Sequence, residues 1–544
     1  MTLFERILTA RGLTTRAARQ AFLQPDYMAV KHDPFLLPDM KKAVARLKQA
    51  REQGEKIVIY GDYDIDGLSA TALLLDAFGK FGFEDVDAFI PNRFVEGYGM
   101  TMGAVDKVRD MGADLIVTVD TGSLCHAEIA YATSLGIDTV VTDHHNVAET
   151  PPPSVAAVNP KFPGHTYPFR DLCGAGVAFK LVQALQTELD GLSDGYEKWL
   201  LDLVALGTVC DIVTLVDENR ANVYWGLEVL KKQQRPGLKA LMMVAGVEPE
   251  QVNARHLGFG LGPRMNAAGR LETAQHALDM LVAHDGLAAL EASEKLEELN
   301  VKRRIIQDAI FEEACVQAEQ LADDRVLVVS SDGWNHGVIG IVASKLVEKY
   351  KKPVFIIGER GEEATGSARS FGDFSAADAV RAADDIIIKG GGHGAAAGVT
   401  LATGKIGDFR RRVNEFYDSL QLTNQERYLL PRADVEIDDF SEIDEELVAN
   451  LAKMEPFGNG NPEPVVKITT AIVLSVRWMG ADGQHVKLAL RDKNGKVLQM
   501  LAFNAPEEFF REPGDEVSVW FQPIINEWQG ARTIEGRLLH VEQV

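Results

Sequence analysis

Three short apolar runs, each followed by acidic or histidine residues, constrain this fold more than any other feature of the sequence. The run KIVIY (Lys56 to Tyr60) precedes the loop GDYDIDG, the run ADLIVTVDTG contains Asp120, and DTVVTDHH ends in Asp143, His144 and His145. Stretches with helical character separate the runs, which predicts β–α–β units on a parallel sheet. The carboxyl ends of such strands share one edge of the sheet, where sites form.

The rest of the chain predicts three further units. Between Leu287 and Asp324 there is no Gly or Pro, and apolar residues recur at helical spacing, which predicts one long helix. A second alternating α/β region begins at Val326. From about Pro464 the pattern becomes all-β, with apolar runs separated by Gly and Asp turns, and five or so such strands suit a small barrel of the OB type.

Composition narrows the class of protein. The 544 residues carry a net charge of −24, which opposes binding to nucleic acid by bulk positive charge but allows a local basic groove. The four cysteines form no CxxC pair, which fits a reducing compartment. The polar start contains no signal core, and no apolar run is long enough to span a membrane. We therefore expect a cytoplasmic protein without membrane contact.

The strand-end residues predict a metal site. Asp62, Asp64 and Asp66 lie in one loop, and Asp211 ends the segment GTVCD. Taken alone, such a loop is often a calcium site or a turn, and a lone aspartate is often a helix cap. Recurrence of these residues in order on one predicted sheet favours a shared centre. A ligand set of many carboxylates and few histidines suits Mn²⁺ or Mg²⁺ better than Zn²⁺. Such a set also suits a site that binds two ions.

These motifs resemble a known family. GDYDIDG, the Asp120 strand, TDHH and GTVCD match the four motifs of DHH phosphoesterases in order. HDPFLLPDM, LGPRMNAAGRL, GSARS, GGGHGAAAG and EPFGNGNPEP resemble the bacterial members that degrade single-stranded DNA. The resemblance implies a parallel-sheet DHH domain with an N-terminal segment, a helical connector, a second α/β DHH-associated domain and an OB-fold domain. The expected ranges are 1–225, 226–325, 326–430 and 431–544.

The resemblance also implies an activity and a ligand set. It implies a 5′→3′ exonuclease that releases mononucleotides from single-stranded DNA by two-metal hydrolysis, in DNA repair and recombination. Asp120 would bridge the two ions, and His145 would face the substrate phosphate. The implied metal ligands are Asp62, Asp64, Asp66, Asp120, His144 and Asp211. The implied catalytic residues are Asp64, Asp66, Asp120, His144, His145 and Asp211.

A phosphate grip is expected in the second α/β region. The implied substrate-binding residues are Arg93, Arg264, Arg270, Ser367, Arg369 and His393. An arginine clamps a terminal phosphate in a bidentate way, and glycines allow close approach of the backbone. Any single arginine is as well explained by a surface salt bridge, and a glycine-rich stretch by a tight turn.

The sequence departs from the family pattern at two positions and also allows two alternative functions. Thr121 stands where the family usually has Asn, and the family's Trp-His pair is interrupted by Asn335, which displaces His336. The alternatives are a phosphodiesterase of short oligonucleotides or cyclic dinucleotides and a catalytically silent DNA-binding scaffold. The long helix and extra β domain disfavour the first, and the complete ligand set disfavours the second. A helicase and a single-strand-binding protein are the expected protein partners, and a monomer is the expected state.

Overall fold

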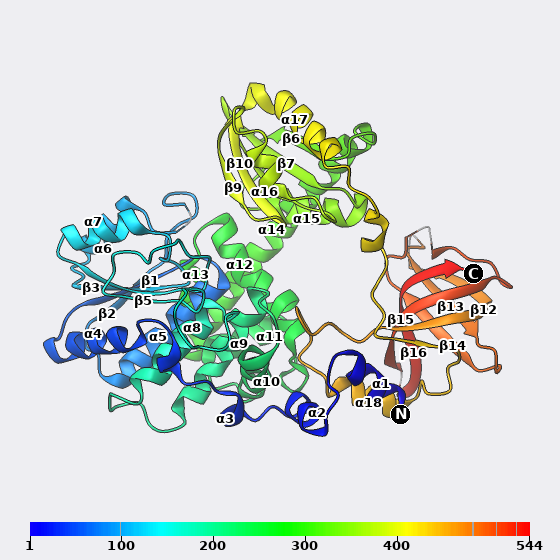
Figure 1. The fold of residues 1–544 in the computed structure, drawn as a ribbon, viewed down its shortest axis with the longest axis horizontal. Helices are drawn as coiled ribbons and strands as arrows, with labels where there is room; N and C mark the ends of the chain where they lie inside the picture. The colour runs from blue at the N-terminus through cyan, green and yellow to red at the C-terminus, as the bar shows by residue number, and fades with distance from the viewer. Residues whose placement is uncertain (98, 481–482, 507–508, 529) are drawn as a thin grey trace.

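The protein forms three lobes joined by long connections (Figure 1). The structure is a computed structural model that describes residues 1–97, 99–480, 483–506, 509–528 and 530–544. A helix-covered sheet forms the first lobe, a smaller α/β unit the second and a β-barrel the third. The predicted fold class is confirmed.

The sheet of the first lobe is parallel, with the strand order β2-β1-β3-β4-β5. Its strands are β1 (Ile57–Gly61), β2 (Val86–Phe89), β3 (Leu115–Val119), β4 (Asp138–Thr142) and β5 (Ala156–Val158). Gly61 pairs with Val119, and Val119 pairs with Thr142, so the residue after each strand emerges at the same edge. The sequence did not indicate β2, which is largely unburied, or β5, which has only 3 residues.

Helices cover both faces of this sheet. Ile57 and Ile59 join the core beneath α5, α8 and α9, whereas Val58 and Tyr60 face α6 and α7, as the alternation of a strand requires. The helices of the lobe are α3 (Tyr27–Val30), α4 (Met40–Gln53), α5 (Ile65–Phe81), α6 (Met102–Asp110), α7 (His126–Ser134), α8 (Gly174–Leu185), α9 (Leu201–Cys210), α10 (Asp217–Lys231), α11 (Pro236–Val244), α12 (Gly262–Leu271) and α13 (Gln275–Val282). Helix α2 (Arg16–Leu23) instead packs against the core of the third lobe through Phe22 and Leu23.

One helix of 35 residues, α14 (Gly286–Gln320), leads from the first lobe to the second, where a long helix is predicted. The second sheet has the order β6-β7-β8-β10-β9. Its strands are β6 (Leu327–Asp332), β7 (Val354–Arg360), β8 (Glu363–Arg369), β9 (Ile387–Gly392) and β10 (Ala396–Ala402), and its helices are α15 (Ile339–Tyr350), α16 (Ala376–Arg381) and α17 (Ile406–Ser419).

The glycine-rich stretch GGGHGAAAG forms a β-hairpin. Its glycines end β9, the edge strand, and pair with β10. A Cβ at Gly390 would lie 2.5 Å from the side chain of Val380, so α16 packs directly on the backbone of this strand. Helix packing therefore explains this glycine without a ligand.

The third lobe is a closed barrel of five strands. They are β12 (Val466–Met479), β13 (His485–Arg491), β14 (Val497–Ala502), β15 (Glu516–Trp528) and β16 (Ala531–Gln543), and pairing of β12 with β15 closes the barrel. The short strand β11 (Val435–Ile437) and α18 (Glu445–Ala452) accompany it. Helix α1 (Leu3–Ala10) packs into the barrel core through Leu3, Ile7 and Leu8, although the sequence grouped it with the first lobe.

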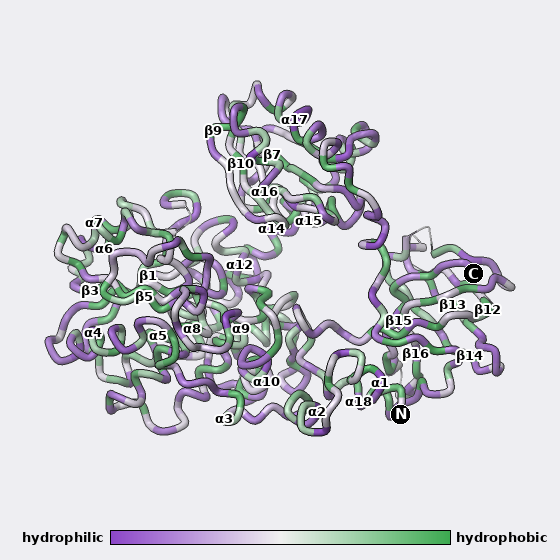
Figure 2. The backbone as a smooth tube through the Cα atoms, viewed as in Figure 1, coloured by the Kyte–Doolittle hydropathy of each residue, from purple (hydrophilic) through white to green (hydrophobic). Residues whose placement is uncertain are grey.

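Hydrophobic and hydrophilic residues are mixed in every lobe (Figure 2). Among the residues that the structure describes, no helix combines the length and the apolar character needed to cross a membrane.

Candidate active site

The loop after β1 places three carboxylates at the start of α5. Oδ1 of Asp64 accepts hydrogen bonds from the backbone N–H groups of Asp66 (2.9 Å) and Gly67 (3.1 Å), and so caps the helix. A Cβ at Gly67 would lie 2.6 Å from the backbone of Asp62, so the loop folds back only over a glycine. Asp62 is consequently held beside Asp64 at the strand edge.

Asp66 is anchored by the amino-terminal end of α8. Its Oδ2 accepts a hydrogen bond from the N–H of Gly174 (2.5 Å), and its Oδ1 accepts one from the N–H of Ala175 (2.8 Å). A Cβ at Gly207 would lie 2.4 Å from Oδ1, so α9 also presses against this carboxylate. Burial, followed by the charge of Asp64, raises the pKa of Asp66 to about 6.

His144 lies at the centre of the carboxylates. Its Nε2 is 3.0 Å from Oδ1 of Asp120, 3.6 Å from Oδ2 of Asp211 and 3.8 Å from Oδ2 of Asp66. Asp120 follows β3 with a left-handed φ of 61°, which Asp tolerates better than most residues. Burial lowers the pKa of His144 to about 4, so the ring is neutral and able to bind a cation.

Asp143 orients the second histidine. Its Oδ1 accepts hydrogen bonds from Nδ1 of His145 (2.9 Å) and from the backbone N–H groups of both histidines, and its Oδ2 accepts one from the N–H of Ser123. Burial favours a neutral ring, but the hydrogen bond to Asp143 and its charge outweigh burial and raise the pKa of His145 to about 9. His145 is therefore a cation at neutral pH, and the carboxylate of Asp143 is occupied by its hydrogen bonds to this histidine and to neighbouring backbone groups.

The donor set fits divalent cations. Three groups of side chains each bring their ligand atoms within 4.8 Å of one another: Asp66, His144 and Asp211; Asp62, Asp64 and Asp120; and Asp120, His144 and His145. Oδ1 of Asp62 is buried without a hydrogen-bond partner among the described residues. Hard oxygen ligands around one or two imidazoles suit Mn²⁺ or Mg²⁺.

Electrostatics leads to the same conclusion. Burial, then the charge of Asp64, raises the pKa of Asp62 to about 7. Burial, then Asp66, raises the pKa of Asp211 to about 8 and holds that of Asp120 well above its ordinary value. Ionised carboxylates this close repel one another unless cations neutralise them.

Removing the metal is expected to make stability fall as the pH rises from about 6.5 to about 8.5. The pKa values of about 7 for Asp62, 8 for Asp211 and 9 for His145 exceed those of the unfolded chain, so the folded state binds more protons in this range. Calorimetric melting in chelator should show the decline, and Mn²⁺ should flatten it by neutralising the carboxylates. Equal slopes with and without Mn²⁺ would contradict this.

A cluster of arginines adjoins the carboxylates. The guanidinium of Arg93 lies 4.3 Å from the ring centre of Tyr63, the residue between Asp62 and Asp64 in the chain. Nε of Arg93 has no hydrogen-bond partner among the described residues. Arg270 donates to the backbone oxygen of Gly337 (2.7 Å). Burial, then the charge of Arg93, lowers the pKa of Arg270 to about 10, because neighbouring cations oppose its charge. Such a cluster favours an anion.

The second lobe completes this pocket. Arg369 donates to Oγ of Ser367 at 3.2 Å and to the backbone oxygen of Ala368 at 2.7 Å. A Cβ at Gly340, in the first turn of α15, would lie 3.0 Å from Oγ of Ser367 and 3.3 Å from Nη2 of Arg369. Glycine thus brings the amino-terminal end of α15, with its partial positive charge, up to both side chains.

The other two predicted substrate residues, Arg264 and His393, have different surroundings. Nε of Arg264 is 2.5 Å from Oε2 of Glu297, so the charge of Arg264 is already balanced. His393 is exposed in the turn between β9 and β10, and its neighbour Ala396 pairs with Arg369. The sequence could not separate Arg264 from Arg270, because the deciding partner, Glu297, lies on α14.

Sequence reasoning missed Arg303, a buried arginine on α14. It donates to the side-chain oxygens of Asn300 and Gln307, which are neutral, and its charge also opposes that of Arg270. It is only 8% exposed, although it has no carboxylate partner among the described residues. The available signal was the spacing of Asn300, Arg303 and Gln307, which puts three polar side chains on the buried stripe of the helix.

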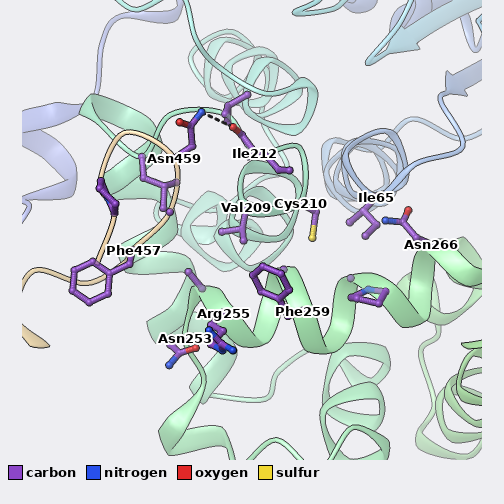
Figure 3. Close-up of a pocket in the computed structure, with 18 of the residues that line it drawn as sticks. Ile65, Val209, Cys210, Ile212, Asn253, Arg255, Phe259, Asn266, Phe457 and Asn459 are labelled. Carbon is purple, nitrogen blue, oxygen red and sulfur yellow. Dashed lines mark hydrogen bonds between the residues drawn. The ribbon is translucent and has the colours of Figure 1, made fainter. Parts of the chain in front are cut away.

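A cavity of about 740 Å³ opens beside these residues. Ile65 and Cys210, the neighbours of Asp66 and Asp211, line it together with Arg270 and Arg303. Figure 3 shows Phe259 and Arg255 on one side of it and Phe457 and Asn459, from the segment that leads to the barrel, on the other. Ile341, from α15 of the second lobe, also lines the cavity, so residues from all three lobes border it.

Comparisons with known proteins identify the family. The DHH family N-terminal domain matches residues 56–208, the DHHA1 domain 323–419 and the RecJ OB domain 433–540. The single-stranded-DNA-specific exonuclease RecJ of Bacillus subtilis is 39% identical over 97% of this chain, which spans 66% of that relative. RecJ of Dickeya dadantii is 34% identical over 94% of this chain and 91% of the relative.

Solved structures agree. RecJ of Thermus thermophilus in complex with Mn²⁺ superposes with a TM-score of 0.82 at 30% identity, covering 99% of this chain and 75% of that one. A second exonuclease RecJ bound to manganese gives a TM-score of 0.63 at 33% identity, covering 72% of this chain and 97% of that one. With its parallel-sheet, second α/β and barrel lobes and its group of carboxylates and histidines able to hold metal, the chain belongs to the RecJ family of single-stranded-DNA-specific exonucleases.

Proposed function

We propose that this chain is a metal-dependent 5′→3′ exonuclease that hydrolyses single-stranded DNA and releases 5′ mononucleotides, in DNA repair and recombination. The observation that carries the proposal is the contact between two opposite charge clusters. Arg93 stacks on Tyr63, whose neighbours Asp62 and Asp64 belong to the carboxylate centre, and its charge opposes that of Arg270 in the phosphate pocket. A phosphate held by the arginines therefore lies close to the metal ligands.

Six side chains are assigned to the metals: Asp62, Asp64, Asp66, Asp120, His144 and Asp211. Two bound divalent ions supply charge neutralisation at the scissile phosphate and an activated water. Asp120 belongs to two of the three ligand groups, which suits a bridging role. The backbone bonds that hold Asp66 and the cap made by Asp64 fix the ligands before substrate arrives, which lowers the reorganisation needed for reaction.

His145 is assigned to the substrate phosphate. Nδ1 of its ring is held by Asp143, and the raised pKa keeps the ring positively charged at neutral pH. A fixed imidazolium beside Asp120 can stabilise negative charge that develops on the phosphate oxygens.

The arginine pocket explains the polarity of digestion. A terminal 5′ phosphate would be held against the amino-terminal end of α15 by Arg369, Ser367, Arg270 and Arg93. The negative oxygens of the phosphate need hydrogen-bond donors and positive charge, and these groups supply both. A 5′ end held there leaves the next phosphodiester at the metals, so each cut removes one nucleotide. Phe259, which is 79% exposed with Arg255 stacked on it, offers an unpaired base a platform along the cavity.

The remaining assignments complete the proposal. The functional units are residues 1–225, 226–325, 326–430 and 431–544, with α1 packed on the last of them. The enzyme acts in the cytoplasm as a monomer, supplied with single strands by a helicase and a single-strand-binding protein. What supports a monomer is that residues of one chain border the cavity from all three lobes.

Arg369→Ala is expected to reduce cleavage of 5′-phosphorylated strands about 10- to 100-fold, because one charge-assisted phosphate contact is lost. Cleavage of strands with a 5′ hydroxyl should change far less, since they lack the group that Arg369 binds. The measurement is kcat/KM for both strands. Arg381→Ala, at an exposed arginine of the same lobe that pairs with Asp378, is the matched control and should change neither. An equal loss on both strands would overturn the assignment.

A further inference from the structure

The segment that enters the barrel also touches the loop that carries Asp211. We name residues 455–463 the docking segment. Nδ2 of Asn459 donates to the backbone oxygen of Ile212 at 2.9 Å, and the backbone oxygen of Asn459 accepts from the N–H of Leu215 at 2.7 Å. Figure 3 shows the first of these bonds at the rim of the cavity. The docking segment is thus fastened directly after the carboxyl end of α9.

The docking segment lies so close to the loop after α9 that two of its positions require glycine. A Cβ at Gly458 would lie 2.8 Å from Cδ1 of Leu215, and one at Gly460 would lie 3.2 Å from Cβ of Thr214. Gly460 also has a left-handed φ of 75°. The shape of the docking segment is therefore fitted to this loop and to the position of Asn459 over Ile212.

Ile212 adopts an unfavourable backbone conformation. Its φ is 60°, a left-handed value that a β-branched residue rarely takes and that a glycine normally supplies at a helix end. Its side chain is 69% exposed, so little side-chain burial compensates for the strain. Its N–H makes only a 3.3 Å bond to Val209, and its carbonyl bond comes from Asn459. Strain of this kind persists where surrounding contacts impose it.

The left-handed residue Ile212 directly follows Asp211 at the end of α9. Asp211 directly follows the last residue of α9, with its N–H bonded to Gly207 at 2.9 Å, and the chain reverses at Ile212. This turn leaves Oδ2 of Asp211 3.6 Å from Nε2 of His144. We expect that relaxation of Ile212 to a right-handed or extended conformation would loosen the end of α9 and let the carboxylate of Asp211 move away from His144.

We infer that Asn459 is a positioning residue for the metal centre, acting through the left-handed backbone of Ile212 on Asp211. The third lobe thereby supplies a bond on which the ligand group of Asp66, His144 and Asp211 depends. The inference rests on the proposed role of Asp211 as a metal ligand. Asn459 is exposed, so its truncation opens no internal cavity. Thr214, bonded to Asp171 through its N–H and hydroxyl, anchors the far end of the loop and stays in place.

Asn459→Ala is expected to weaken Mn²⁺ binding about 10- to 100-fold, the usual effect of removing a group that orients a metal ligand. Binding is measured on the full chain by electron paramagnetic resonance of free Mn²⁺ during titration, without substrate. The KM for Mn²⁺ in cleavage should rise in parallel, while kcat at saturating Mn²⁺ stays near the wild-type value. Asn450→Ala, at a partly exposed asparagine on α18 that bonds to Lys453, is the matched control and should bind Mn²⁺ as the wild type does.

A second substitution tests the route. Ile212→Gly in the Asn459→Ala background should restore Mn²⁺ affinity, because glycine adopts φ near 60° without strain. Loss of affinity without this rescue would overturn the route through Ile212, and wild-type affinity in Asn459→Ala would overturn the inference. Asp211→Asn separates this from the proposed function: wild-type Mn²⁺ affinity in that variant would remove Asp211 from the ligand set itself.

Discussion

Replacing Asp120 by asparagine is expected to reduce cleavage by about 10³-fold or more while the chain stays folded. Asp120 is 1% exposed and shares ligand distance with Asp62 and Asp64 on one side and with both histidines on the other. Asparagine keeps its shape but removes the negative charge that would bridge two cations. It also removes repulsion among buried carboxylates, so the metal-free variant should melt at a higher temperature than the wild type.

The measurement combines kcat with Mn²⁺, Mn²⁺ binding and melting in chelator. Asp202→Asn is the matched control, because Asp202 is also buried but bonds to Arg235 at 3.0 Å, away from the metal ligands. It should retain kcat and lose stability, the opposite pair of effects. Cleavage by Asp120→Asn at the wild-type rate, with unchanged dependence on Mn²⁺, would remove Asp120 from the centre.

Gly207→Ala is expected to reduce kcat about 100-fold, although it adds only a methyl group, because small displacements of reacting groups have effects of this size. That methyl would lie 2.4 Å from Oδ1 of Asp66 and 2.8 Å from Cβ of Ala175. Asp66 cannot turn aside without breaking its bonds to the N–H groups of Gly174 and Ala175. Helix α9 must move instead, which also costs about 1–3 kcal/mol of stability.

Gly79→Ala provides the control within the same lobe. Gly79 lies in α5, and a Cβ there would meet no atom within 4 Å. Alanine should therefore stabilise the protein by about 0.5–1 kcal/mol and leave kcat unchanged. Kinetics and melting curves of both variants, measured side by side, separate a specific effect on Asp66 from a general effect of added bulk. Wild-type kcat in Gly207→Ala would show that Asp66 tolerates displacement.

The sequence predicts the edge of the sheet where the centre forms, because strand-end residues follow from chain order alone. Gly61, Val119 and Thr142 lie in register, so the aspartates after them had to emerge together. The roles assigned to these residues stay predictions until variants are measured. The long helix and the barrel were equally accessible, since uninterrupted helical spacing and repeated turns are local signals.

Features that depend on distant partners were not accessible. The balance of Arg264 by Glu297, and the burial of Arg303 beside Arg270, arise where α14 packs on α12. The packing of α1 into the barrel joins residues more than 400 positions apart, as the bond from the N–H of Leu3 to Glu442 shows. The strain at Ile212 also has no local cause, because its partner Asn459 belongs to another lobe.

Net charge gave only a weak guide to the substrate. The chain carries −24 overall, yet Arg93, Arg270, Arg303 and Arg369 gather near the carboxylates. In the proposed function, local cations supply the phosphate contact, whereas the bulk charge disfavours indiscriminate binding to duplex DNA. This combination fits an enzyme that grips one strand end.

The most direct test of the proposed activity is a time course with Mn²⁺ on a long single strand labelled at either end, beside a dinucleotide. We predict progressive release of mononucleotides from the 5′ end by the wild type and none by Asp120→Asn. Cleavage of the dinucleotide alone would contradict the proposal and identify a short-substrate phosphodiesterase. No cleavage of either substrate by a folded, Mn²⁺-bound sample would contradict it in favour of a DNA-binding scaffold.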